Sequence, residues 1–157
     1  MFCDQYGYVR SKIMVEDSLI KEIVEQVCLS LALKDSKRDP RNMLAFTILD
    51  NTVEMILKFY AVFNNLLKED EIDSQDAFVF ILDKIKEQNK IVSFEENDII
   101  RYHKILDEFN VKDNFIIEES TIDEYAVLAK ILLARLFDYR ATKLEWDIMV
   151  DKVRTHV

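Results

Sequence analysis

Apolar residues recur along the chain at the spacing of three and four positions that is typical of α-helices. In residues 16–34 they fall at i, i+1, i+4, i+5, i+8, i+9 and i+12, and charged or amide side chains stand between them. The pattern predicts one amphipathic helix that packs by a single face. That face consists of Leu19, Ile20, Ile23, Val24, Val27, Cys28 and Leu31.

A longer helix is predicted to begin at Asp39 and Pro40 and to continue to about residue 67. Asp39 is a favourable N-cap, and Pro40 suits the first helical position because an N–H there would have no helical partner. Apolar residues cover more than half of the circumference, so this helix should either lie centrally in a bundle or have a second interface. Its main face is formed by Leu44, Ala45, Ile48, Leu49, Val53, Ile56, Leu57, Tyr60, Phe63 and Leu67, and Phe46, Met55, Phe59 and Val62 broaden it.

The rest of the chain predicts shorter helices that are separated by polar connectors. After an acidic turn at residues 68–71, Asp73 or Ser74 can cap a helix that continues to about residue 88. The sequences SFEE at 93–96 and TIDE at 121–124 fit the capping box that opens a helix. The predicted inward residues of these three helices are Phe78, Ile81, Leu82 and Ile85, then Ile99, Tyr102, His103, Leu106 and Phe109, then Ile122, Tyr125, Ala126, Ala129, Leu132, Leu133, Leu136 and Phe137.

Glycine and proline are nearly absent, with one of each in 157 residues, where average usage of roughly 12% would supply about nineteen. Folds rich in β-turns and glycine-dependent phosphate loops are therefore excluded, since Gly7 alone can build neither. We expect an all-α fold, an antiparallel bundle of five to six helices around a four-helix core. Residues 1–157 should form a single domain, with an N-terminal arm at 1–15, a core bundle at about 16–137 and a C-terminal helix at about 140–154.

Acidic residues exceed basic ones by 30 to 21, which gives a formal net charge of −9. Such a surface repels polyanions, so nucleic acid is not an expected partner. The densest basic cluster, Lys34, Lys37, Arg38 and Arg41, is interrupted by acids, and we interpret it as an ordinary connection between helices.

The two cysteines, Cys3 and Cys28, lack metal-binding spacing and indicate buried or free thiols in a reducing compartment. The chain contains no apolar stretch of the roughly 18 residues that a membrane span requires, and its first residues do not resemble a signal peptide. A cytoplasmic protein that does not enter a membrane is the resulting expectation.

A search for metal and catalytic motifs gives little. A di-iron bundle requires Glu-x-x-His, but Ile100 precedes His103 by three residues and Val153 precedes His156 by three. Two acidic pairs, Glu22 with Glu25 and Glu95 with Asp98, have the spacing with which helical nucleotide pyrophosphohydrolases bind magnesium. Both pairs lie near predicted helix starts, where the helix dipole favours acids, so we interpret them as structural and expect no metal and no cofactor.

Two segments together resemble the HEPN superfamily of helical bundles, which includes toxins linked to nucleotidyltransferases and several ribonucleases. Residues 52–60, TVEMILKFY, look like the long second helix of that family. Residues 98–105, DIIRYHKI, followed by residues 121–132, TIDEYAVLAKIL, look like its ending, in which a histidine-x-isoleucine helix is joined to the next helix by a connector. The resemblance covers roughly residues 40–137 and implies a dimeric bundle.

The resemblance fails at the catalytic motif. Active members of the family carry an Arg-x4–6-His motif in which arginine and asparagine follow the isoleucine, and two copies meet in the dimer to cleave RNA. Here Leu106 and Asp107 stand at the arginine and asparagine positions, and the histidine position falls near Val111. Without the imidazole and the guanidinium, neither 2′-hydroxyl activation nor phosphate stabilisation is available. The resemblance therefore implies a catalytically silent copy.

The sequence thus predicts a catalytically silent, dimer-forming, HEPN-like interaction module that pairs with itself or with a nucleotidyltransferase-type partner in a toxin–antitoxin or defence system. Candidate interface residues, for which a core role is the alternative, are Val127, Leu128, Ile131, Tyr139 and Trp146. One rival is a divergent, metal-independent ribonuclease that uses Asp98, Arg101 and His103. The other is an unrelated helical adaptor.

Overall fold

Helices account for all the regular secondary structure in the computed structural model, which describes residues 4–34, 39–68, 77–109 and 116–157. The predicted all-α helical bundle is confirmed for these residues. Those outside them include the predicted caps Asp73 and Ser74, most of the acidic turn at 68–71, and Lys37 and Arg38 of the basic cluster. The helices are α1 (Asp4–Lys34), α2 (Asp39–Phe63), α3 (Ala77–Glu87), α4 (Ser93–Phe109), α5 (Glu119–Phe137) and α6 (Lys143–Arg154).

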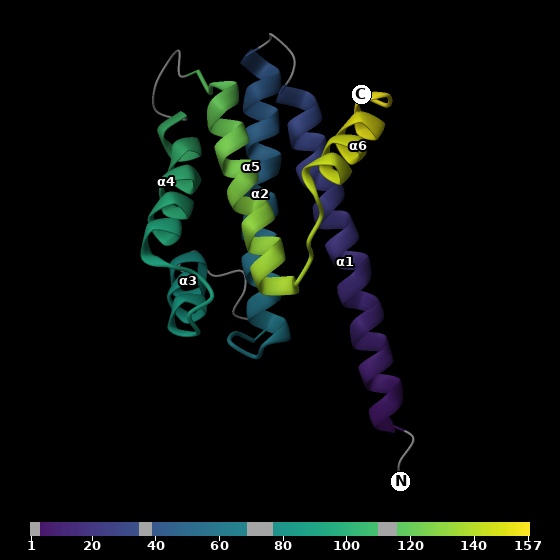
Figure 1. The fold of residues 1–157 in the computed structure, drawn as a ribbon. Helices are drawn as coiled ribbons and strands as arrows, with labels where there is room; N and C mark the ends of the chain where they lie inside the picture. Colours follow the sequence, from purple (N-terminus) through teal and green to yellow (C-terminus); the bar gives the residue numbers. More distant parts are fainter. Residues whose placement is uncertain (1–3, 35–38, 69–76, 110–115) are drawn as a thin grey trace.

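Helix α2 lies at the centre of the bundle, as its broad apolar girth predicts. It contacts α1, α3, α4 and α5, and in Figure 1 α1 and α4 run in the direction opposite to α2 and α5. Phe46, Leu49, Val53, Ile56 and Leu57 of α2 are all completely buried. Residues on several sides of α2 are therefore in the core, which explains why its apolar surface exceeds one face.

One apolar residue of α2 was assigned to the wrong side. Leu44 was expected to face inward, but it is half exposed. It lies seven residues, or two helical turns, before the exposed Asn51, so both belong to the outer face of the helix. The burial of Ala45 and Phe46, which follow Leu44 directly, sets the core side of this turn.

Helix α1 begins much earlier than the sequence pattern suggests. The expected arm at residues 1–15 is helical from Asp4 onward, so α1 has 31 residues and its first part was missed. Met14 and Val15 are exposed, and the contribution of α1 to the core, among its described side chains, begins at Leu19. Figure 1 shows the first turns of α1, in purple, running past the ends of the neighbouring helices.

Two of the helix starts differ from the predicted capping boxes. In α4 the Glu95 carboxylate accepts a hydrogen bond from the backbone N–H of Val92 at 3.1 Å. The capping box predicted this kind of bond between Glu96 and Ser93, so it forms one residue earlier than predicted. Helix α5 starts at Glu119, with Glu118 as its N-cap and no side-chain cap, and Thr121 therefore lies inside the first turn.

A complete capping box occurs instead at α6. The Thr142 hydroxyl accepts the N–H of Glu145, while the Glu145 carboxylate accepts the N–H of Thr142. These hydrogen bonds lower the pKa of Glu145. The sequence TKLE carries this signal, so the start of α6 was predictable from the capping-box rule.

Asparagine and aspartate end three helices in the left-handed conformation that glycine usually adopts. Among the described residues, positive φ outside glycine occurs at Asn65 (55°), Asn89 (57°) and Asp138 (55°). At the end of α5 the backbone N–H groups of Asp138 and Tyr139 both donate to the carbonyl of Leu133. These short polar residues tolerate positive φ better than most others do, so the turns form without glycine.

None of the helices in the described ranges combines the length and the apolar character that crossing a bilayer requires.

Candidate functional site

A buried carboxylate joins three helices at His103, the histidine singled out from the sequence. Asp50 of α2 has only 3% of its side chain exposed, and its Oδ2 lies 3.0 Å from Nδ1 of His103 on α4. Its other oxygen, Oδ1, accepts a 2.7 Å hydrogen bond from the hydroxyl of Tyr125 on α5. Both oxygens of one buried acid thus have partners, as a buried polar group requires.

Aromatic rings surround this group. Phe78 of α3 stacks on the imidazole of His103 with the ring centres 4.1 Å apart. Tyr102 stacks on Tyr125 with the ring centres 4.5 Å apart, and the ring of Phe46 is tilted against that of Tyr125 with the centres 5.5 Å apart. The hydroxyl of Tyr102 donates to Glu124 at 3.0 Å. These rings pack against the imidazole of His103 and the phenol of Tyr125.

The charged side chains that influence His103 are acids. The hydrogen bond to Asp50 raises the pKa of His103, and the negative charges of Asp50, Glu54 and Asp107 act in the same direction against the effect of burial. Lys58, the cation next to Glu54 on α2, is paired with Glu54 at 2.6 Å. The side chain of His103 is 34% exposed, so solvent reaches the ring. An acidic rim of this kind repels the phosphate groups of RNA.

The other two candidate catalytic residues form a local pair. Arg101 donates to Asp98 at 3.0 Å, one turn away on the exposed face of α4, and its guanidinium lies 4.6 Å from the ring centre of Tyr102. Among the described residues, Asp98 and Arg101 contact each other, and Arg101 also lies over the ring of Tyr102. His103 instead contacts Asp50 and Phe78. The structure therefore does not join Asp98, Arg101 and His103 in one catalytic arrangement.

The acidic pairs with magnesium-binding spacing have structural roles where their contacts are described. Glu95 is buried and contacts Arg135 of α5 in addition to capping α4. Its neighbour in the pair, Asp98, binds Arg101. Within the described ranges, no three histidine, cysteine, aspartate or glutamate side chains gather to hold a metal ion.

The five candidate interface residues fall into three environments. Leu128 and Trp146 are buried in the chain's own core, so for them the core alternative holds. Val127 and Ile131 are 54% and 37% exposed, one turn apart on the outer side of α5. Tyr139 is half-buried, packs edge-on against Trp146 with the ring centres 6.0 Å apart, and lines a groove.

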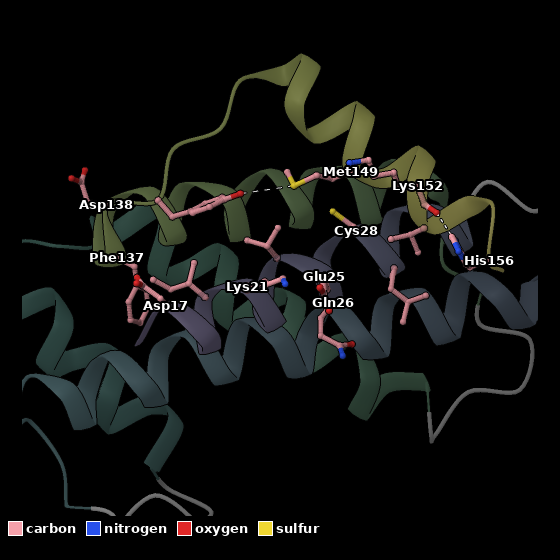
Figure 2. A pocket seen from close by; sticks show the side chains of 15 residues that line it. Asp17, Lys21, Glu25, Gln26, Cys28, Phe137, Asp138, Met149, Lys152 and His156 are labelled. Atoms are coloured by element: carbon pink, nitrogen blue, oxygen red, sulfur yellow. Dashed lines mark hydrogen bonds between the residues drawn. The ribbon is translucent and has the colours of Figure 1, made fainter. Parts of the chain in front are cut away.

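This groove runs between α1 and α6, and residues at the end of α5 and in the segment that joins α5 to α6 also line it. It has a volume of about 950 Å³ and a mostly apolar floor. Figure 2 shows Asp17 and Phe137 toward one end and Lys152 and His156 toward the other, with Cys28 and Met149 between them. The apolar floor is built by Ile20, Val24, Leu29, Phe137, Met149 and Val153.

Cys28 lies in the wall of the groove but is almost completely buried. Burial raises the pKa of its thiol to about 11, against the smaller opposing effect of the Lys130 charge. Lys130 in turn has a lowered pKa because it is partly buried, and its ammonium lies 4.7 Å from the ring centre of Trp146. A thiol with so high a pKa is a poor nucleophile, and Cys28 acts as a small apolar residue.

Sequence reasoning missed two features of the candidate site. Asp50 was not singled out, although it lies between Phe46 and Val53 on the core side of α2, where an acid among apolar residues indicates a buried polar contact. The groove was missed because its walls come from residues more than 100 positions apart, such as Lys21 and Lys152, and no local pattern joins them.

A scan of the chain against protein-family models finds no match. Searches of curated proteins and of solved structures give no match either.

Proposed function

We propose that this protein is a non-enzymatic interaction module of HEPN type that forms a homodimer. The observation that carries the proposal is the apolar groove of about 950 Å³ between α1 and α6, which is open to solvent in the single chain. A mostly apolar groove of this volume is within the range of pockets that bind ligands. The exposed pair Val127 and Ile131 on α5 adds a second, smaller apolar surface.

The chemistry around His103 supports a module without ribonuclease activity. A general acid or base for RNA cleavage acts beside a cation that stabilises the phosphate in the transition state. The charged residues that influence His103 are the acids Asp50, Glu54 and Asp107. The geometry accounts for His103 as a side chain that ties α4 to α2 and α3.

The family resemblance suggests a nucleotidyltransferase as the second partner, in a toxin–antitoxin or defence system. The net charge of −9 favours a partner with a basic docking face over nucleic acid. Pull-down of a co-expressed nucleotidyltransferase from the same genome, repeated in high salt, tests this part of the proposal. A complex that weakens as salt rises supports it, and no complex at low salt contradicts it.

The oligomeric state tests the central proposal. Light scattering coupled to size exclusion, with the purified protein at micromolar concentration, should give the mass of two chains. The mass of one chain would contradict the dimer and favour the unrelated helical adaptor.

One observation favours the ribonuclease alternative enough to test it. Nδ1 of His103 is engaged by Asp50 and the ring is partly exposed, an arrangement that fixes the ring and leaves Nε2 for proton transfer. An RNA-cleavage assay should detect no activity in the wild-type protein. Cleavage that is abolished in His103→Ala but retained in Lys104→Ala, a change at the exposed neighbour, would establish the ribonuclease.

A further inference from the structure

We infer that the homodimer forms through the outer face of α5, which packs antiparallel against α5 of a second copy of this chain. The inference rests on the proposed dimer and specifies its interface. In Figure 1 α5 lies at the front of the bundle, between α4 and α6 and with α2 behind it. The exposed residues Val127 and Ile131 of α5 do not line the groove between α1 and α6, so that groove stays available to a second partner.

Four side chains form one row along the outer face of α5, each four residues after the one before. In chain order they are Asp123, Val127, Ile131 and Arg135. Residues four apart lie on adjacent turns of one side of a helix, and such rows are the ridges by which helices pack against each other. Val127 is 54% exposed and Ile131 37%, and the side chains of Asp123 and Arg135 are 52% and 38% exposed. The row therefore offers solvent an apolar centre between an acidic end and a basic end.

This row is complementary to itself when its direction is reversed. A two-fold axis at the level of Ala129 places Val127 opposite Ile131 of the second copy, and Asp123 opposite Arg135 of the second copy. Each of these contacts then occurs twice, as a two-fold symmetric interface requires. The two Asp123 carboxylates stay ~18 Å apart along the helix, because twelve residues separate position 123 from position 135.

The charges also decide the direction of the second helix. A parallel pair would bring Asp123 against Asp123 and Arg135 against Arg135, and contacts between like charges oppose association. The antiparallel pair replaces both repulsions with attractions between an acid and a base. The same row thus favours a second copy in one orientation and disfavours it in the other.

Both charged ends are held in place by contacts within their own chain. Asp123 pairs with Lys34 at 2.8 Å, and Arg135 contacts Glu95 and the carbonyl of Lys90 through Nη1. A guanidinium has five N–H donors and a carboxylate accepts several hydrogen bonds, so each group can bind a second partner without losing the first. Because these side chains are already positioned, less conformational entropy is lost when the second copy binds.

The neighbouring helix α4 extends the apolar surface at one end of the row. Tyr102 of α4 donates to Glu124 of α5, and Glu95 of α4 contacts Arg135, so α4 runs alongside α5. Phe94 directly precedes Glu95 and is 68% exposed, which places a large apolar side chain near the Arg135 end. A stable interface buries about 800 Å² on each partner, more than one helix face supplies, so we expect α4 to contribute.

A matched pair of arginine substitutions is the first test. Val127 on α5 and Val79 on α3 are exposed to 54% and 53%, so an arginine at either position should leave the core intact. Val127→Arg introduces a charge into the apolar centre of the interface. By light scattering over a dilution series, the dimer dissociation constant should rise at least tenfold for Val127→Arg and remain unchanged for Val79→Arg.

The outcomes separate this interface from the dimer itself. A dimer that Val127→Arg does not weaken, or that both substitutions weaken equally, would overturn the inference and leave the proposed dimer standing. A wild-type protein with the mass of one chain would overturn both. Cooperative thermal unfolding of the two variants checks that each is folded.

Disulfide cross-linking tests the antiparallel direction. In a Cys3→Ser background that keeps the buried Cys28, one sample carries Val127→Cys and another carries Ile131→Cys. After the two are mixed and have exchanged subunits, mild oxidation should give more covalent dimer on a denaturing gel than either variant gives alone. Equal or greater cross-linking of a single variant, or none in a mixture that is dimeric, would overturn this arrangement.

Discussion

The hydroxyl of Tyr125 donates a 2.7 Å hydrogen bond to the carboxylate of Asp50, a residue 75 positions earlier in the chain. Tyr125 is fully buried, and burial, together with the nearby Asp50 charge, raises its pKa well above the usual value. The phenol therefore stays protonated and remains a donor throughout the physiological range. This bond joins α5 to α2 in the centre of the bundle.

Removal of the Asp50 carboxylate should destabilise the fold. Asp50→Ala leaves the buried Tyr125 hydroxyl without an acceptor, which costs about 1–3 kcal/mol of unfolding free energy. The matched control is Asn51→Ala at the exposed neighbouring position, with an expected change within about 0.5 kcal/mol. Urea unfolding followed by circular dichroism measures both. Similar midpoints for the two variants would show that the buried bond contributes nothing.

The contact between His103 and Asp50 predicts a pH dependence with a definite sign. The hydrogen bond raises the pKa of His103 in the folded state above its ordinary value of 6.5. A raised histidine pKa stabilises the fold fully below the unfolded-state value, and this stabilisation is lost as pH rises through the folded-state pKa. Thermal melts of wild type and His103→Gln should therefore differ more at pH 6 than at pH 9. A difference that grows with rising pH would contradict the assignment.

Cys28 should resist alkylation in the native protein. With a pKa of about 11, roughly one thiol in a thousand is ionised at pH 8, and the thiolate is the reactive form. In a Cys3→Ser background, iodoacetamide should leave Cys28 unmodified in native buffer and modify it fully in urea, as followed by mass spectrometry. Modification in native buffer at the rate of a free cysteine would show that the groove wall opens.

The contact between Arg135 and Glu95 should matter more than other surface ion pairs. The Glu95 carboxylate is almost fully buried, so Arg135→Ala leaves it without its cation at a cost of about 1–3 kcal/mol. Arg140→Ala is the control because Arg140 and its partner Asp138 are both well exposed, and exposed pairs contribute about 0–1 kcal/mol. Chemical unfolding of the two variants should rank them in this order.

Helix positions could be predicted from the sequence because the helices carry their own periodicity. The stripe Phe78, Ile81, Leu82 and Ile85 of α3 is buried as predicted, against the neighbouring helices α2 and α4. The start of α1 could not be predicted in this way. Met14 and Val15 are exposed, and among its described side chains α1 contributes to the core only from Leu19 onward, so burial imposes no apolar pattern on the residues directly before Leu19.

The candidate site was less predictable because its members come from different helices. His103 was recognisable as a polar residue on an apolar face, but its partner Asp50 lies 53 positions before it. Tyr125, which donates to the same carboxylate, lies 22 positions after it. Only the packing of α2 against α4 and α5 brings them together. Val127 and Leu128 illustrate the same limit, because adjacent residues on one helix differ completely in burial according to where its neighbours lie.

The left-handed residues Asn65, Asn89 and Asp138 affect the unfolded chain as much as the folded one. Replacement of any of them by glycine would relieve backbone strain of at most about 1–2 kcal/mol, but it would widen the conformational freedom lost on folding, an opposing effect of about 0.5–1 kcal/mol. Within the described residues, the chain thus ends helices with side chains that restrict the unfolded ensemble before folding begins. A sequence with so little glycine starts its folding search from a smaller set of conformations.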